Sequence, residues 1–166
     1  MVLQEIISPL NESTARLLRV IGHFSTRMFN ENVNGDKWTP GQVAEHLLLT
    51  DIFVIRLLRG ELSFAARRTD EKVATIQELF RGDGDTPSPP PFTVPSDLIK
   101  DPLFVSQQIS RERNSMLHYL DTIDEDSLCT AYTDPLLGQL TITEWSWYII
   151  CHGDHYSRQL SKMINN

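Results

Sequence analysis

Two of the five histidines, His46 and His152, are the residues whose type and spacing could do chemistry. His46 lies beside an apolar stripe that begins at Val43, and His152 lies in a second stripe between Ile149 and Tyr156. Both stripes have helical spacing, so each histidine faces inward from its own helix. Imidazole is the commonest metal ligand and a frequent acid or base. The pair therefore predicts a metal or catalytic centre.

The third ligand of such a centre is harder to assign. Histidines that share a metal from one helix usually stand four residues apart, but the fourth residue after His152 is Tyr156. At about 100° per residue, Tyr156 stays on the arc of His152, whereas His155 lies about 60° to one side and must lean in from the flank. The motif H-E-x-x-H is absent, so the sequence does not support a zincin protease.

Other candidate residues are expected to have ordinary structural roles. His23 and His118 lie beside apolar stripes without a polar partner, so we expect them to be partly exposed. Asp154 points away from His152 and is expected to be solvated. Cys151 is about 100° from His152 and is interpreted as a buried or half-buried thiol, since no Lys or Arg beside it activates it.

The helices that must position these side chains follow from apolar residues that recur at spacings of three, four and seven. This pattern predicts long helices over residues 6–28, 39–60, 103–120 and 141 to the chain end. The first helix should bury one stripe, formed by Ile6, Leu10, Leu17, Ile21, Phe24 and Met28.

Two of these helices begin with clear start signals. In Thr39-Pro40-Gly41-Gln42, the threonine can cap the helix, the proline fits the first turn, and the glutamine can close a capping box. Thr141-Ile142-Thr143-Glu144 is a second capping box. In the third helix, Val105 and Ile109 are expected to face inward, and the run Arg111-Glu112-Arg113 outward.

The connections complete an all-α fold. Residues 81–102 contain six prolines, and those between residues 87 and 95 forbid a regular helix over most of the segment, so we expect a long crossover loop there. Residues 70–80 can form a short helix, and residues 121–138 form a polar connection; no strand pattern competes. The sequence therefore predicts one domain over residues 1–166, a four-helix bundle with a long Pro-rich crossover.

Composition and charge exclude several classes of function. The chain has 15 Lys and Arg against 22 Asp and Glu, a net charge of −7, which argues against a nucleic-acid groove. No apolar run is long enough to cross a bilayer. No basic segment precedes an apolar run at the start, so we expect a cytoplasmic protein without a secretory signal. Two cysteines are too few for a disulfide framework or a Cys-rich zinc site.

Two segments resemble a known family. Residues 38–47, WTPGQVAEHL, are similar to the W-[ST]-x-x-Q-x-x-x-H-[LI] start of the second helix in DinB-like proteins. Residues 135–145, PLLGQLTITEW, followed by His152 and then by Gln159-Leu160, resemble the last helix of that family, where a histidine precedes H-x-x-Q-[IL]. The helix lengths and the crossover also fit, so the resemblance spans nearly the whole chain.

The resemblance implies an up-down-down-up bundle, a homodimer, and a divalent metal ion held by three histidines. The first family ligand falls on His46 and the second on His152, but the third falls on Tyr156. Either His155 substitutes from the flank, or Tyr156 supplies a phenolate oxygen, or the site binds metal weakly or not at all. A neutral tyrosine is a poor ligand, because its pKa near 10 must first be lowered.

Two functions follow from the resemblance. The first is a metal-dependent hydrolase, or a transferase that uses a low-molecular-weight thiol, acting on a small-molecule substrate. His46, His152 and His155 would hold zinc, nickel, iron or manganese, all compatible with imidazole, and Tyr156 would act as ligand, proton donor or oxyanion stabiliser. The alternative is a degenerate bundle that binds a small ligand or a protein partner without chemistry. The acidic charge opposes DNA binding.

Overall fold

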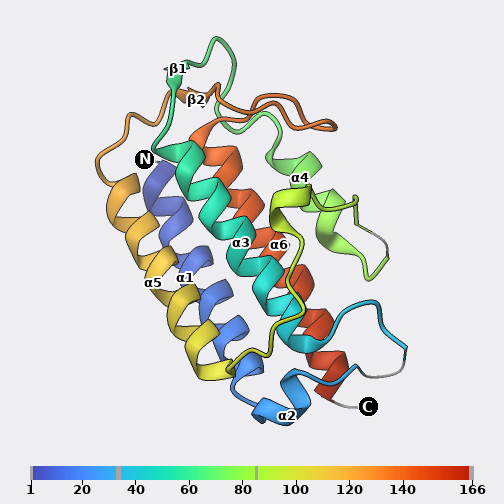
Figure 1. Cartoon of the computed structure of the whole chain (residues 1–166). Helices are drawn as coiled ribbons and strands as arrows, with labels where there is room; N and C mark the ends of the chain where they lie inside the picture. The colour runs from blue at the N-terminus through green and yellow to red at the C-terminus, as the bar shows by residue number, and fades with distance from the viewer. Residues whose placement is uncertain (1, 33–34, 85, 165–166) are drawn as a thin grey trace.

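Four long helices dominate the fold. The structure is a computed structural model that describes residues 2–32, 35–84 and 86–164. The long helices lie side by side (Figure 1): α1 (Val2–Ile21), α3 (Pro40–Leu58), α5 (Pro102–Leu120) and α6 (Ile142–Ile164). In Figure 1, α1 and α6 run downward from the end that holds the N-terminus, while α3 and α5 run upward. Among the described residues, no helix is long and apolar enough to cross a membrane.

Shorter elements complete the two ends and one side. β1 and β2 pair antiparallel at the upper end, with Leu62 opposite Cys129. α4 packs against α6, and the 3-10 helix η1 packs against α3. These elements and the short helix α2 have the following bounds: α2, Thr26–Phe29; β1, Leu62–Phe64; α4, Val73–Arg81; η1, Pro91–Thr93; β2, Ser127–Cys129.

The two expected capping boxes are present. The backbone N–H of Gln42 donates to Thr39 Oγ1 at 3.1 Å, and Gln42 Oε1 accepts from the N–H of Thr39 at 3.0 Å. Glu144 and Thr141 make the same reciprocal pair at the start of α6, at 3.1 and 3.0 Å. These bonds satisfy N–H groups that a helix start leaves without partners, so they fix where the two histidine-bearing helices begin.

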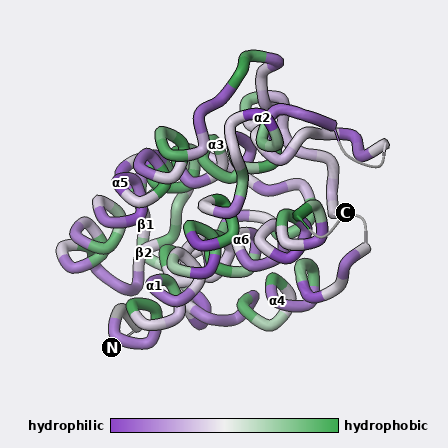
Figure 2. The backbone as a smooth tube through the Cα atoms, turned by 90° about the horizontal axis from the view of Figure 1, so that it is seen from below, coloured by the Kyte–Doolittle hydropathy of each residue, from purple (hydrophilic) through white to green (hydrophobic). Residues whose placement is uncertain are grey.

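The core follows from the amphipathic patterns. Figure 2 views the helices nearly end-on and shows that each long helix carries both hydrophobic and hydrophilic residues. One buried cluster, which includes Trp145, lies toward the β1–β2 end, and a second, which includes Phe29 and Tyr156, lies toward α2. The predicted helix over residues 103–120 is confirmed as α5, and the described residues between α4 and α5, 82–84 and 86–101, form the expected loop apart from η1.

The first predicted helix ends earlier than its apolar spacing suggests. α1 stops at Ile21, and α2 begins only after Ser25, whose hydroxyl accepts from the N–H of Met28. Phe24 is buried although it lies in the connection, so its place in the stripe misled the prediction. Met28, expected inside, is 40% exposed.

Two further expectations are wrong. The described chain contains a short two-stranded ribbon where no strand was expected, because β1 and β2 are only three residues each and carry no alternating pattern. Arg113 was expected outside but is 1% exposed. Its Nε donates to Asp51 Oδ2 at 2.7 Å, and this buried carboxylate is what allows a guanidinium inside the helix core.

Candidate functional site

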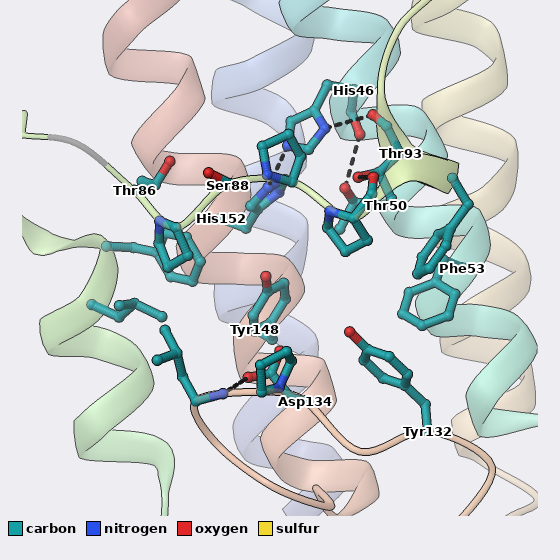
Figure 3. Close-up of a pocket in the computed structure, with 18 of the residues that line it drawn as sticks. His46, Thr50, Phe53, Thr86, Ser88, Thr93, Tyr132, Asp134, Tyr148 and His152 are labelled. Carbon is teal, nitrogen blue, oxygen red and sulfur yellow. Dashed lines mark hydrogen bonds between the residues drawn. The ribbon is translucent and has the colours of Figure 1, made fainter.

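The structure brings His46 and His152 into direct contact. His46 comes from α3 and His152 from α6, and both side chains are buried. Their Nε2 atoms lie 3.0 Å apart, and the two rings meet edge-on with centroids 4.9 Å apart. Figure 3 shows the pair at one end of a pocket. The inward orientation expected from the helical spacing is therefore confirmed for both residues.

The hydrogen bonds around the pair define the proton positions. His46 Nδ1 lies 2.8 Å from the carbonyl oxygen of Thr93, which can only accept, so Nδ1 carries the proton and Nε2 the lone pair. His152 Nε2–H then donates to His46 Nε2. This leaves His152 Nδ1 as a buried lone pair without a partner among the residues that the structure describes.

Burial keeps both imidazoles neutral. Desolvation lowers the pKa of His46, and the hydrogen bond to Thr93 opposes this effect only in part. The pKa of His152 lies well below its ordinary value, chiefly through burial and further through the positive charges that His46, His155 and Arg113 carry when protonated. Since a metal ligand or a general base needs the neutral form, the pair is ready for either role at neutral pH.

Tyr156 joins the pair as its helical position predicts. Its ring centroid lies 5.2 Å from that of His46 and 4.9 Å from that of His152. Its hydroxyl lies 3.2 Å from Thr86 Oγ1 in the crossover. Burial raises the pKa of Tyr156, and the bond to Thr86 counters only part of that rise. The phenol therefore stays protonated at neutral pH, as a donor rather than a phenolate.

His155 is not brought to the same spot. Its Nδ1 donates to the carbonyl oxygen of Gly82 at 3.0 Å, and its ring packs against Phe80 and Tyr156. It lines a second, more polar pocket of about 560 Å³, together with Gln159 and Lys162 among others. Over the described ranges, no group of three His, Cys, Asp or Glu could hold a metal ion.

The remaining sequence candidates lie apart from the pair. His23 and His118 are exposed, as expected. Asp154 bonds Arg16 on α1 at 2.9 Å instead of being merely solvated. Cys151 is half-buried, and burial raises its pKa to about 11, so its thiol is unreactive at neutral pH.

The pocket beside the histidines has a volume of about 370 Å³, the size of a small-molecule site. Its described lining is mostly aromatic and proline side chains from α3, α4, α6, the crossover and the loop before α6. Figure 3 places the histidines at one end, and Tyr132 and Asp134 at the other. Tyr148 lies between them and stacks on His152, with ring centroids 5.7 Å apart.

Sequence reasoning missed most of this lining. Phe53, Tyr132, Asp134 and Trp145 all line the pocket, but the sequence patterns assigned none of them to it. The signal that could have found Tyr132 is an aromatic residue inside an otherwise polar connection. Trp145 is 1% exposed and its Nε1–H has no partner in the described part of the chain, so a bound ligand could accept from it.

The donor set fits two ligands of one metal ion. Two nitrogens on a tetrahedral ion stand about 3.3 Å apart when each bond is about 2.0–2.1 Å, close to the 3.0 Å between the two Nε2 atoms. His46 already has the required tautomer, with its Nδ1–H on a backbone carbonyl, as metal-binding histidines usually have. His152 would have to move its proton to Nδ1. The ring of Tyr156 contacts both imidazoles, which places its side chain beside the pair.

Comparison with known proteins assigns the family. A family model of the DinB superfamily matches residues 10–160, nearly the whole described chain. Searches among curated proteins and among solved structures found no match. The matched range includes the capped start of α3, the crossover and α6, which together carry the site. The chain therefore belongs to the DinB superfamily.

Proposed function

We propose that this protein is a divalent-metal-dependent enzyme that acts on a small molecule in the pocket beside His46 and His152. The observation that carries the proposal is the contact of two buried, neutral imidazoles through their Nε2 atoms at one end of a pocket of about 370 Å³. The reaction is a hydrolysis or a transfer involving a low-molecular-weight thiol. Zinc, nickel, iron and manganese all suit imidazole ligands.

His46 and His152 would hold the ion, and non-protein ligands such as water or substrate would complete its surroundings beside the Tyr156 hydroxyl. The bound ion supplies Lewis acidity, which polarises a substrate or lowers the pKa of a thiol. The Thr93 carbonyl orients His46. The protonated hydroxyl of Tyr156, held by Thr86, can donate to charge that develops on the substrate. The aromatic and proline side chains that line the pocket would limit the access of water to the bound substrate.

The fold of the proposed enzyme is the up-down-down-up four-helix bundle that its family resemblance implies. The opposite directions of α1 and α6 against α3 and α5 support this assignment. A homodimer and a cytoplasmic location also belong to the proposal. Sedimentation of the purified protein tests the oligomeric state.

A second candidate function is a bundle that binds a small ligand without metal. It is favoured by the direct hydrogen bond between the imidazoles, which uses the two atoms that a metal would need. The lack of a three-residue ligand cluster over the described ranges points the same way. The pocket would then serve binding alone.

Metal analysis of the untagged protein separates the two candidates. The protein is measured as purified and after loading with zinc, nickel, manganese or ferrous iron, in parallel with His46→Ala, His152→Ala, His155→Ala and Tyr156→Phe. We expect one ion per chain, with affinity reduced in His46→Ala and His152→Ala by more than the roughly 10–100-fold that the loss of an outer-shell partner causes. His155→Ala should retain the metal, because His155 bonds Gly82 instead.

The exposed His23 provides the matched control, since His23→Ala removes an imidazole outside the pocket. Retention of metal by both His46→Ala and His152→Ala would rule out the proposed centre. Absence of metal after every loading would leave the ligand-binding bundle as the function. The Tyr156→Phe variant shows whether the phenol oxygen contributes to affinity.

A further inference from the structure

The end of the pocket away from the histidines is built from aromatic rings. Phe53 on α3 is the centre of this group, and the other members come from the crossover, the loop before α6, and α6 itself. Its ring centroid lies 4.5 Å from that of Phe92, 5.0 Å from that of Tyr132 and 6.2 Å from that of Trp145. We call these four residues the aromatic end. Ring faces and edges from four separate segments thus border one small space.

Asp134 is the one Asp, Glu, Lys or Arg among the described residues that line this pocket. Its Oδ1 accepts from the backbone N–H groups of Leu136 and Leu137, each at 2.9 Å. Its backbone pairs with Gly138 at 3.0 and 2.9 Å across a tight turn, where Gly138 has a φ of 77° that favours glycine. The carboxylate is therefore held in place by the turn.

The negative charge of Asp134 acts on the pocket. It is one of the causes, after burial, that raise the pKa of Tyr132 and of Tyr148, so its field reaches both rings. No ion pair joins Asp134 to any residue that the structure describes. Asp134 therefore gives this end of the described lining a negative charge that no described cation pairs with.

Several aromatic faces beside one carboxylate match the chemistry of an organic cation. A cation within about 6 Å of a ring centroid is attracted by the negative face of the ring, most strongly by Trp and Tyr. A neutral apolar ligand would remove water from the carboxylate without supplying a counter-ion for its negative charge, which is unfavourable. An anion would meet repulsion. A bare divalent metal prefers several oxygen ligands, and the aromatic end offers one carboxylate.

We propose that the aromatic end binds an alkylammonium group of the ligand, with Asp134 as its counter-ion. The rest of such a ligand would extend past Tyr148 toward His46 and His152. The inference therefore deepens the proposed function by naming its substrate class, a small molecule with an organic cation at one end. Binding of the cation itself does not require the histidine centre.

The experiment compares choline with 3,3-dimethylbutan-1-ol, its neutral isostere, by NMR titration of the full-length protein. The Trp145 indole N–H reports binding at the aromatic end. We expect choline to bind about tenfold more tightly than the alcohol, because only the cation gains from the ring faces and the carboxylate. The two compounds share shape and apolar area, so the ratio of their affinities isolates the charge.

The variants test the two components separately. Asp134→Asn removes the charge, while its amide oxygen can still accept from Leu136 and Leu137, and it should bring the two affinities close together. Asp124→Asn is the matched control, because Asp124 is exposed outside the pocket and its Oδ1 also accepts a nearby backbone N–H, from Asp126 at 3.2 Å. Phe53→Leu and Tyr132→Leu should weaken choline and spare the alcohol.

Equal affinities of choline and the alcohol in the wild-type protein would overturn the inference, as would binding of neither at millimolar concentrations. An equal effect of Asp134→Asn and Asp124→Asn would also overturn it. Circular dichroism of each variant identifies loss of fold. If a leucine variant is unfolded, the inference is tested by Asp134→Asn alone. If the protein binds metal but does not prefer choline over the alcohol, this inference is wrong and the proposed function stands. If it prefers choline but binds no metal, the inference stands and the proposed metal-dependent function is wrong.

Discussion

His46 and His152 depend on each other through protons, and Tyr156 packs against both rings. Thr93 fixes the proton of His46 on Nδ1, which makes its Nε2 the acceptor for His152. The Nδ1 of His152 is left buried without a partner in the described chain. A third proton on the pair would have to enter a space that disfavours charge, so protonation and folding are linked.

This linkage predicts a pH dependence of stability. The pKa values of His46, His152 and His155 are all lowered in the folded chain, mainly by burial. Above a pH of about 6.5 they are neutral in both states; below it the unfolded chain binds protons that the folded chain excludes. The free energy of unfolding should therefore decrease as the pH is lowered below about 6.5, by roughly 1 kcal/mol per pH unit for each such histidine.

Urea unfolding at a series of pH values between 8 and 5 measures this fall, with the range set about the ordinary histidine pKa. The variant His152→Gln, which cannot take up a proton there, should show a shallower decline, and His23→Gln on the surface should match the wild type. A decline in His152→Gln as steep as in the wild type would show that the buried pair is not its source.

The sequence could predict the position of a site residue only where helical periodicity determines it. Tyr156 follows from geometry alone, because 3.6 residues per turn place it on the arc of His152. His155 also comes from α6, but its neighbours Gly82 and Phe80 lie on another element, and no spacing announces them. Asp134 could not be identified, since the path of a loop over a pocket is not encoded in local periodicity.

At the scale of elements, the start of α6 carries more interactions than the start of α3. Glu144 is completely buried, and it accepts from the N–H groups of Thr141 and Lys72 as well as from two nitrogens of Arg67. The capping glutamate thus also holds the segment that links β1 to α4. Thr39 at the start of α3 serves its own helix alone in the described hydrogen bonds.

This difference predicts unequal effects of removing the two caps. Glu144→Ala should lower the free energy of unfolding by about 3–5 kcal/mol, because it removes the buried carboxylate that pairs with Arg67 and leaves two backbone donors without their acceptor. Thr39→Ala should cost about 1 kcal/mol, as for an ordinary N-cap. Chemical denaturation at neutral pH measures both values. Equal losses would mean that Glu144 acts as a cap and nothing more.

Helix starts could be predicted because their signals are local, whereas the end of α1 could not. The apolar spacing continues to Met28, yet the chain leaves the helix after Ile21 and buries Phe24 from a turn. Periodicity reports which residues are buried and does not report whether the backbone between them stays helical. The short strands escaped notice because three residues are too few to show alternation.

At the scale of the whole molecule, Arg113 is the point at which the four long helices meet. From α5 it bonds Asp51 on α3 at 2.7 Å and Thr14 on α1 at 3.1 Å. It also lies against Gly153 on α6, where a methyl group would come within 2.8 Å of its Nη2. Gly153 directly follows His152. The close packing of the buried Arg113 guanidinium against Gly153 therefore also helps to fix the position of His152.

The ion pair predicts a strongly non-additive response. Burial raises the pKa of Asp51, and the charge and hydrogen bonds of Arg113 oppose that rise. Arg113→Met or Asp51→Leu alone should cost about 3–5 kcal/mol of stability, since each leaves an unpaired buried group. The double variant should recover most of the loss. Thermal and urea unfolding of all four proteins measure the coupling, and simple additivity would exclude it.

One contact has a consequence for how this sequence can vary. The group that orients His46 is a main-chain carbonyl at Thr93, which every amino acid possesses. Replacing the side chain at that position cannot delete it, whereas removing or adding a single residue between Pro87 and Thr93 would carry it out of reach. Substitutions at position 93 should therefore leave His46 oriented, whereas insertions and deletions in this part of the crossover should not, a pattern that a comprehensive mutational library would reveal.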